Sequence, residues 1–358
     1  MPNLIDLPQA KLFPQQLAAF SPKSIQAKKL FRFDAQQTHH SLQSFEGQSV
    51  LGIDIGGTTI EVQLFSIIDA WLTPIESPLN KTLKSHGGVG YYDFLIETCN
   101  RANKEHVPIG VSYAGPLEGS QIIGGPNVGA LLQEIDKHHG SFDFFDWLPG
   151  LIGVSNDAIA GLIGSSCHIA RYSAEARSYM YLINGSGIGL ASLSHSSLYA
   201  TEAGHVAVIP ELNRWGHNEP CEVSHSPLIC LEKVIAGKAG IERIWRIETN
   251  NSLAAPEIEE QYLQGDELAK CLYDNSAIGL AHVIVGVAQS LDIPLDFSAK
   301  VICHGGSFKF PRYKDRVQQI LAYNGYHDTE LVSTYDLSQN TCLEGAALLA
   351  LIGAPGKE

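Results

Sequence analysis

The 358-residue sequence has few charged residues, and positive charge is the scarcer sign. Charged residues make up 17% of the chain, and 24 lysine and arginine residues face 38 aspartate and glutamate residues, for a net charge of −14. Phosphate backbones and anionic lipids repel such a surplus, which argues against a nucleic-acid or membrane partner. Apolar residues are not scarce, because they make up 44% of the chain. This share supports sizeable cores and excludes disorder of the whole chain.

Disulfide, membrane and export signals are also missing. The seven cysteines are scattered without any CxxC pair, which predicts reduced core thiols. The most apolar stretches, around 277–287 and 346–352, are shorter than the roughly 20 residues that a bilayer needs. The N-terminus lacks the charged and apolar regions of a signal peptide. We therefore expect a cytoplasmic protein.

The length corresponds to about two domains at roughly 150 residues each. Residues 1–46 differ from the rest, since they are rich in Gln, Lys and Phe and are interrupted by four prolines. We expect them to form an N-terminal extension, docked or partly disordered, with one helix over Ser24–Phe31. The expected domains are 47–155 completed by the C-terminal helix 341–358, and 156–340.

Strand and helix patterns alternate from residue 48 onward, which predicts an α/β fold. A strand, a glycine turn and a second strand occur twice, suggesting two related halves. The expected strands cover 49–53, 59–65, 107–112, 151–154, 179–183, 188–192 and 300–303. The expected helices cover 91–103, 158–169, 228–236, 241–245, 266–273, 275–290 and 341–352.

The first glycine turn has the chemistry of a phosphate-binding loop. Its two glycines, Gly56 and Gly57, let backbone N–H groups approach an anion without a Cβ in the way. Thr58 and Thr59 add hydroxyl donors, and the Asp54 carboxylate stands where a hydrated Mg²⁺ could bridge to phosphate. An ordinary tight hairpin is the alternative interpretation of this segment.

Two further glycine turns follow strands later in the chain, at Gly185-Ser186-Gly187 and at Gly305-Gly306-Ser307. Two such turns on opposed domains could grip a triphosphate from both sides. None is a Walker A loop, because the pattern G-x4-GK-[ST] occurs nowhere in the sequence. Each alone is also typical of a simple hairpin, so their recurrence carries the prediction.

These turns resemble the motifs of a known family. Residues 52–59 are similar to the phosphate-1 motif of ROK and bacterial glucokinase-like sugar kinases, in the actin/hexokinase/Hsp70 superfamily. Residues 185–189 resemble its phosphate-2 motif, residues 304–307 its adenosine motif, and Gly115-Pro116 followed by Pro126-Asn127 its connecting segment. The resemblance covers about 48–352. It implies two actin-like (ribonuclease H-like) α/β domains with a cleft between them, and ATP with Mg²⁺ as cofactors.

Asp157 follows a short buried strand and precedes a helix, so its side chain is expected at a strand end, where α/β clefts usually lie. By its position alone, it would most often be a helix N-cap. The resemblance implies instead that Asp157 is the general base toward the accepting hydroxyl. It further implies a set of sugar-binding residues: Asn127, Asn156, Asp157, Glu202, His205 and Glu232.

The chain departs from the family between His205 and Glu232. Many ROK proteins carry C-x-C-G-x-x-G-C there and bind zinc with it and the histidine, whereas this segment keeps only Cys221 and Cys230 and adds His225. These thiols and imidazoles are suitable zinc ligands. Because the family's ligand set is incomplete, two buried cysteines without zinc are the expectation.

The sequence thus predicts an ATP-dependent kinase that phosphorylates a hydroxyl of a hexose or amino sugar. A sugar-responsive regulator or binding protein that has lost catalysis is the first alternative, and a member acting on a non-sugar substrate is the second. The expected partners are a small sugar and a nucleotide, with a homodimer as the default assembly.

Overall fold

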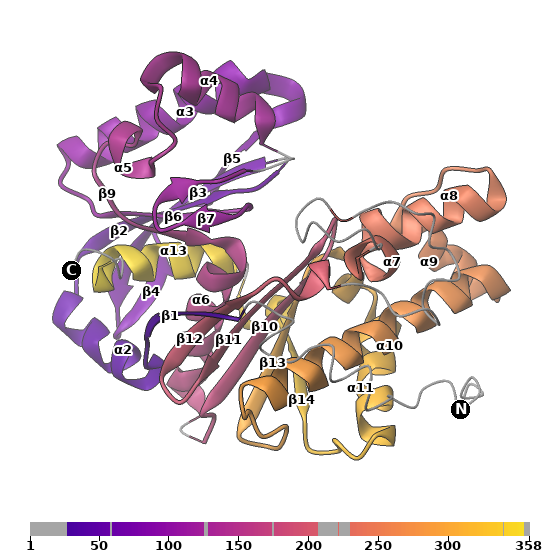
Figure 1. The fold of residues 1–358 in the computed structure, drawn as a ribbon. Helices are drawn as coiled ribbons and strands as arrows, with labels where there is room; N and C mark the ends of the chain where they lie inside the picture. The colour runs from indigo at the N-terminus through magenta and orange to yellow at the C-terminus, as the bar shows by residue number, and fades with distance from the viewer. Residues whose placement is uncertain are drawn as a thin grey trace. The chain divides into compact units, whose positions relative to one another are not determined.

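The structure is a computed structural model that describes residues 27–57, 59–124, 128–173, 175–206, 221, 230–338 and 340–353. Its contacts divide the chain into two compact units. The first comprises Phe31–Ala174 and Leu337–Glu358, and the second comprises Glu175–Asp336 with the chain up to Leu30. Each unit combines a sheet with helices (Figure 1), which confirms the predicted α/β class.

The first unit is built on a mixed sheet with the strand order β4-β3-β2-β6-β9, in which β5 also pairs with β3. Strands β2, β6 and β9 run parallel, and β3 returns antiparallel to β2. The carboxyl ends of three parallel strands therefore share one edge of the sheet. The bounds are β2 Ser49–Ile55, β3 Thr59–Ile68, β4 Trp71–Pro74, β5 Leu79–Thr82, β6 Ile109–Tyr113, β9 Leu151–Asn156, and a separate pair, β7 Leu117–Glu118 with β8 Gln121–Ile122.

A row of three glycines seats the C-terminal helix α13 (Thr341–Ile352) on this sheet. Gly52, Gly110 and Gly153 are register partners on β2, β6 and β9. A Cβ on any of them would collide with the backbone of α13, at Leu343, Ala346 and Leu349 respectively. Only glycine permits so close an approach of helix and strand. The predicted helix 341–352 is confirmed, and it packs directly over the parallel strands.

Helix α6 (Asp157–Tyr172) packs against α13, where Gly164 and Gly345 each leave room for the other helix's backbone. The two units are therefore divided after α6, at 174/175, whereas the sequence analysis set the domain boundary before this helix, at 155/156. The remaining helices of this unit are α2 Ala35–Ser41, η2 Leu42–Phe45, α3 Leu83–Lys104, α4 Gly129–His139 and α5 Phe144–Trp147.

The second unit has a six-stranded sheet with the order β1-β12-β11-β10-β13-β14. Strands β10 and β13 are parallel neighbours, and β10, β11 and β12 form an antiparallel meander. Its core joins these strands to the long helix α10 and to α11. The bounds are β1 Lys28–Arg32, β10 Ser178–Asn184, β11 Ile188–Ser194, β12 Ser197–Thr201, η3 Ala203–His205, α7 Glu232–Ile235, η5 Gly237–Glu242, α8 Arg243–Thr249, α9 Ala255–Gln264, α10 Glu267–Ser290, β13 Ala299–His304, η6 Gly306–Lys309, α11 Pro311–Tyr323, β14 Glu330–Ser333 and α12 Thr334–Leu337.

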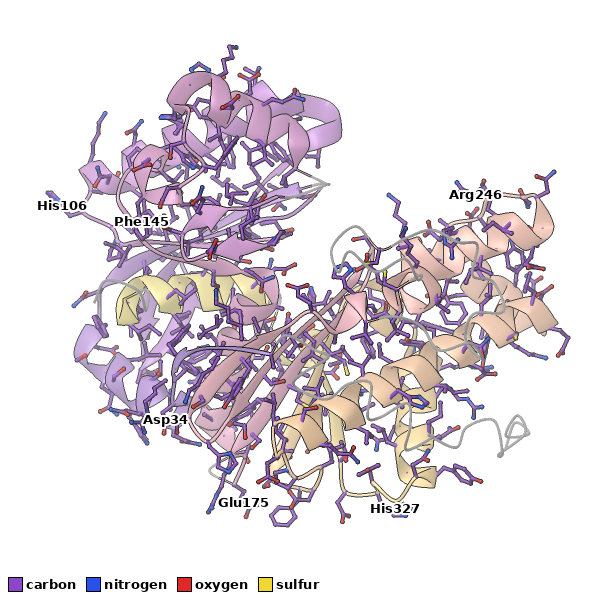
Figure 2. The ribbon with its side chains drawn as sticks, in the orientation of Figure 1. Asp34, His106, Phe145, Glu175, Arg246 and His327 are labelled. Carbon is purple, nitrogen blue, oxygen red and sulfur yellow. The ribbon has the colours of Figure 1, made fainter. Side chains whose placement is uncertain are left out.

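The start of the described chain corrects one prediction. Residues 28–31 were expected to belong to the helix Ser24–Phe31, but Lys28–Arg32 forms strand β1 and pairs with β12. Pairing with an open sheet edge outweighs the helix propensity of this lysine-containing segment. The first described helix is α2, where the Asp34 side chain accepts a hydrogen bond from Gln37 N and caps the first turn. Asp34 is labelled in Figure 2.

Helix α10 is the one described helix that is long and apolar enough by composition to cross a membrane, with a mean hydropathy of 1.3 over 18 residues. Burial inside the unit accounts for this composition, since 83% of that stretch is covered. The two helices expected at 266–273 and 275–290 are one continuous helix. Asp274 is instead helical and buried, with its carboxylate paired to Arg316 at 2.6 Å, so nothing interrupts the helix.

Candidate active site

The first glycine turn joins β2 to β3 as a tight hairpin. Ile55 pairs with Ile60, and Gly56 N donates a hydrogen bond to Thr59 O at 2.9 Å. A Cβ on Gly56 would lie 2.9 Å from that same oxygen, which explains the glycine. Thr58 lies outside the described residues. Gly57 is half-buried at the tip of the turn. A loop that binds an anion through its backbone N–H groups must keep them accessible in this way.

Asp54 stands at the base of this turn as a half-buried carboxylate. Ser112 Oγ donates a hydrogen bond to Asp54 Oδ1 at 2.6 Å, and the Asn340 side chain also hydrogen-bonds to the carboxyl group. Glu61 is its register partner on β3. The pKa of Asp54 is raised to about 6, chiefly by burial and in part by the Glu61 charge, while the Ser112 and Asn340 hydrogen bonds oppose the shift.

Register places Asp54 near the predicted base. Asp54 pairs with Ser112 on β6, and Ser112 pairs with Ser155 on β9, two residues before Asp157. Neighbouring strands lie about 4.8 Å apart, so Asp54 and Ser155 are about 10 Å apart at one edge of the sheet. Asp157 follows this strand, so both carboxylates belong to the same edge of the sheet.

The structure corrects the N-cap interpretation of Asp157. Asn156 is the N-cap of α6, and its Oδ1 accepts a hydrogen bond from Ile159 N at 3.1 Å. Asp157 is the first residue of the helix, and its Oδ1 accepts from Asn156 Nδ2 at 3.0 Å and from Ala158 N at 2.8 Å. The positive end of the helix dipole favours the ionised carboxylate there. Asp157 is thus oriented by its neighbours without being needed as the cap.

Three residues around these carboxylates were missed in the sequence: Ser112, Glu61 and Asn340. Asn340 caps α13, accepting hydrogen bonds from Cys342 N and Leu343 N, and its Nδ2 donates to Glu61 at 2.7 Å. Glu61 is recognisable in principle, because it opposes Asp54 across the hairpin. Asn340 has the signal of an N-cap before a helix. Its contact with Asp54 could not be predicted from that signal, because the two residues are separated by almost the whole chain.

In the second unit, the other two glycine turns lie side by side. They follow the parallel strands β10 and β13, where Ile183 pairs with His304. A Cβ on Gly185 would lie 3.9 Å from Gly306 N. Gly305 has a φ of +103°, and a Cβ there would collide with the carbonyl of the residue before Gly185. The backbone of these two turns forms one continuous glycine-rich surface.

Ser186 stands between the glycines of its turn, where Gly185 N donates to Gly187 O at 3.0 Å. Ser307 is placed differently, because its side chain is buried and a Cβ on Gly237 would lie 3.2 Å from its Oγ. Ser307 therefore supports the turn from within the unit.

Glu232, one of the predicted sugar ligands of this unit, lies at Ile188, the first residue after the turn. Glu232 Oε2 accepts a hydrogen bond from Ile188 N at 3.0 Å and would lie 2.5 Å from a Cβ on Gly187. Gly204, between Glu202 and His205, packs on Ile188 O, where a Cβ would come within 2.7 Å. The exposed Glu202 carboxylate lies 3.9 Å from His205 Nε2. Asn127 lies outside the described residues.

His205 is also part of a cluster with Cys221 and Cys230. The three ligand atoms lie within 4.8 Å of one another, and Cys221 Sγ is 3.6 Å from His205 Nδ1. Burial raises the pKa of the Cys230 thiol to about 12. Three soft donors so arranged fit three positions of a tetrahedral zinc site, a more compact set than the sequence analysis expected. His225 lies outside the described residues, and the absence of zinc stays a prediction.

Comparisons with known proteins place this geometry in context. The solved structures that resemble the chain include a ROK hexokinase from Thermus thermophilus, at 22% identity and a TM-score of 0.61, covering 85% of this chain and 98% of that one. A ROK family glucokinase from Streptomyces griseus in complex with glucose and AMPPNP has 19% identity and a TM-score of 0.58, with 85% and 100% covered. These likenesses confirm the predicted two-domain actin-like fold.

A ROK family transcriptional regulator, a homolog of the E. coli MLC protein, is similar as well, with 17% identity, a TM-score of 0.57, and 86% and 80% covered. The curated protein sequences contain no match to this chain. The family model described as ROK family matches residues 50–352, which is most of the chain and includes every described residue of the candidate site. The chain therefore belongs to the ROK family.

Proposed function

We propose that the protein is an ATP-dependent kinase that phosphorylates a hydroxyl of a hexose or amino sugar. The observation that carries this proposal is the placement of Asp54, with its phosphate-type hairpin, and of Asn156-Asp157 at one edge of the parallel strands. A carboxylate beside a phosphate-type turn, with a second carboxylate after another strand of the same parallel set, suits phosphoryl transfer to an alcohol. The glucokinase among its structural relatives binds glucose and AMPPNP.

The nucleotide phosphates are assigned to the glycine turns. The cofactor-binding residues of the proposal are Asp54, Gly56, Gly57, Thr58, Thr59, Gly185, Ser186, Gly187, Gly305, Gly306 and Ser307, the last from a buried position. Hydrated Mg²⁺ fits beside Asp54, because hard oxygen ligands suit it and it keeps several waters next to substrate phosphates. Bound there, it would neutralise charge on the phosphates. Asp54 itself holds this position through its bond with Ser112.

The sugar is assigned to Asn127, Asn156, Glu202, His205 and Glu232, with Asp157 against the accepting hydroxyl. Acidic side chains suit a polyol, because each carboxylate oxygen accepts hydrogen bonds from adjacent hydroxyls. Glu232 can hold the Ile188 N–H and a sugar hydroxyl together, since a carboxylate accepts several hydrogen bonds.

In the reaction, the sugar oxygen forms a bond to the γ-phosphorus while the bond from that phosphorus to the ADP oxygen breaks. Asp157 accepts the hydroxyl proton as the new bond forms. Asn156 Nδ2 and Ala158 N both bond to Asp157 Oδ1 and so orient the carboxyl group toward its substrate.

A sugar-responsive regulator without catalysis is the second candidate function, because a ROK transcriptional regulator is among the structural relatives. The presence of Asp54, Asp157 and both glycine turns in one chain favours the kinase. With the kinase, we propose a soluble cytoplasmic protein with a sugar and a nucleotide as partners, without nucleic acid or membrane, and with a homodimer as the default assembly.

Sugar-dependent release of ADP tests the proposal. Purified protein with ATP and Mg²⁺ is screened against glucose, mannose, fructose, N-acetylglucosamine and N-acetylmannosamine, beside a reaction without sugar. We expect at least one sugar to raise ADP release well above the sugar-free rate, with one phosphorylated sugar formed per ADP. Calorimetric binding of a sugar without any turnover would favour the regulator instead.

A further inference from the structure

Asn184 is a fully buried polar residue at the end of β10, directly before the glycine turn 185–187. Its Nδ2 donates a hydrogen bond to the Tyr313 hydroxyl at 2.7 Å, and its Oδ1 accepts one from Gly237 N at 3.2 Å. An amide buried this deeply is stable only when such bonds are made. Its role in the molecule therefore depends on what these partners hold.

These hydrogen bonds continue through two hydroxyl groups, and the donor and acceptor of each bond can be assigned. The Tyr313 hydroxyl is 2.7 Å from Ser276 Oγ, and Ser276 Oγ donates to Ile235 O at 2.6 Å. Because the Asn184 amino group can only donate and Ile235 O can only accept, the Tyr313 hydroxyl donates to Ser276. Burial raises the pKa of Tyr313, so the phenol keeps the proton that it donates. Hydrogen bonds in such a chain strengthen one another.

Three segments meet at Asn184. Residues 237–239 pack on the glycine turn, with Lys238 N and Ala239 N donating to Gly185 O and Ser186 O at 3.2 Å each. Gly305 packs on the Asn184 carbonyl from the other glycine turn. The buried hydrogen-bond chain therefore holds the two glycine turns of this unit and residues 237–239, which support them.

We infer that Asn184 and Tyr313 are positioning residues for the nucleotide, which hold the backbone N–H groups of the two glycine turns where phosphate binds. This inference rests on the proposed function. Donors that are fixed before the ligand arrives bind it better, because no ordering remains to be done on binding. The pair is therefore expected to act on nucleotide binding and not on the sugar or on the Asp157 step.

Tyr313→Phe tests the inference, because it removes one hydroxyl and leaves the Asn184 amino group without its acceptor. We expect the dissociation constant of the ATP analogue AMPPNP to rise about tenfold, as for the loss of one buried hydrogen bond. The sugar dissociation constant and kcat at saturating ATP should stay close to wild type.

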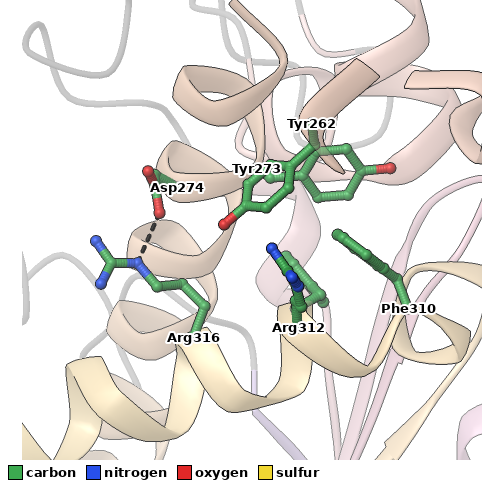
Figure 3. A pocket seen from close by; sticks show the side chains of 7 residues that line it. Tyr262, Tyr273, Asp274, Phe310, Arg312 and Arg316 are labelled. Carbon is green, nitrogen blue, oxygen red and sulfur yellow. Dashed lines mark hydrogen bonds and ion pairs between the residues drawn. The ribbon is translucent and has the colours of Figure 1, made fainter. Parts of the chain in front are cut away.

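Tyr273→Phe is the matched control. The Tyr273 ring packs with those of Tyr262 and Phe310 (Figure 3). It also packs with the Tyr313 ring, and its hydroxyl bonds to Ala255 O and Glu259 Oε1 instead of Asn184. A similar loss of stability is expected from both variants. Only Tyr313→Phe should weaken AMPPNP binding.

Unchanged AMPPNP binding by Tyr313→Phe, or equal weakening by both variants, would overturn the inference. If Tyr313→Phe does not fold, Ser276→Ala provides the same test, because it removes one member of the hydrogen-bond chain without altering a ring. Weaker AMPPNP binding at unchanged sugar affinity would support the inference, and unchanged AMPPNP binding would overturn it. Wild-type protein that binds no nucleotide would overturn the proposed function, and this inference with it.

Discussion

At the scale of single residues, Asp54 carries the clearest electrostatic signature of the site. Its pKa is raised to about 6, mainly by burial and further by Glu61 on the neighbouring strand. An ionised carboxylate held in such a place destabilises the folded state but is ready for a cation or a phosphate-bound metal. The same residue should therefore lower stability and support function.

The Asp54→Asn variant is predicted to be more stable than wild type at neutral pH and inactive. Because the folded pKa of Asp54 lies above its unfolded value, its protonation stabilises the fold below about pH 4, and this contribution is lost as the pH rises through about 6. The shift of about two units corresponds to about 3 kcal/mol at most. Asn can still accept the Ser112 hydrogen bond.

Melting curves at pH 4, 6 and 8 check this prediction. The melting temperature of Asp54→Asn should exceed that of wild type at pH 8, and the two should converge toward pH 4. Asp292→Asn, which removes an exposed carboxylate after α10, controls for the change in net charge. A variant that melts below wild type at pH 8 would contradict the account of Asp54.

At the scale of elements, β1 and α2 show which part of the chain's start belongs to the fold. Phe33, Ala35 and Leu42 are buried, and α2 packs against α6, the helix that begins at Asp157. Every matched site residue lies after residue 46. We therefore expect residues 1–46 to be dispensable for the chemical step, whereas β1, α2 and η2 contribute to the stability of the fold.

A chain that begins at Ala27 is predicted to keep the melting temperature and the ADP release of the full chain, because β1, α2 and η2 remain. A chain that begins at Gly47 should have a free energy of unfolding that is several kcal/mol lower. Each large apolar side chain that is removed from the core contributes about 1.5–3 kcal/mol. Thermal melting and sugar-dependent ADP release check both. A folded chain from Ala27 without turnover would place part of the site in the first 26 residues.

At the scale of the whole molecule, local patterns predicted most of the elements and the glycine turns. The turns are recognisable because glycines between two strands determine their own geometry within a few residues. The edge strand β1 was missed because its partner β12 lies about 170 residues later. Helix α10 was divided at Asp274 because its buried ion pair with Arg316 is a contact over 42 residues.

The same distinction applies to the candidate site. The positions of Asp54 and Asp157 at strand ends could be predicted from local signals, whereas their roles stay predictions. Ser112, Asn340 and Asn184 could not, because strand register and helix packing bring them to the site. The boundary of the first unit follows the contact of α6 with α13, which joins segments about 180 residues apart.

The steady-state kinetics of Asp157→Asn test the central claim most directly. Asn removes the proton acceptor, whereas its Oδ1 can still accept from Asn156 Nδ2 and Ala158 N, and the cap at Asn156 is untouched. General-base catalysis contributes about 10²–10⁴-fold, so kcat should fall by that order while sugar and nucleotide affinities change little. Asp266→Asn, the same exchange at the cap of α10, should leave kcat unaltered. A folded Asp157→Asn protein with a near-normal kcat would contradict the assignment of the base.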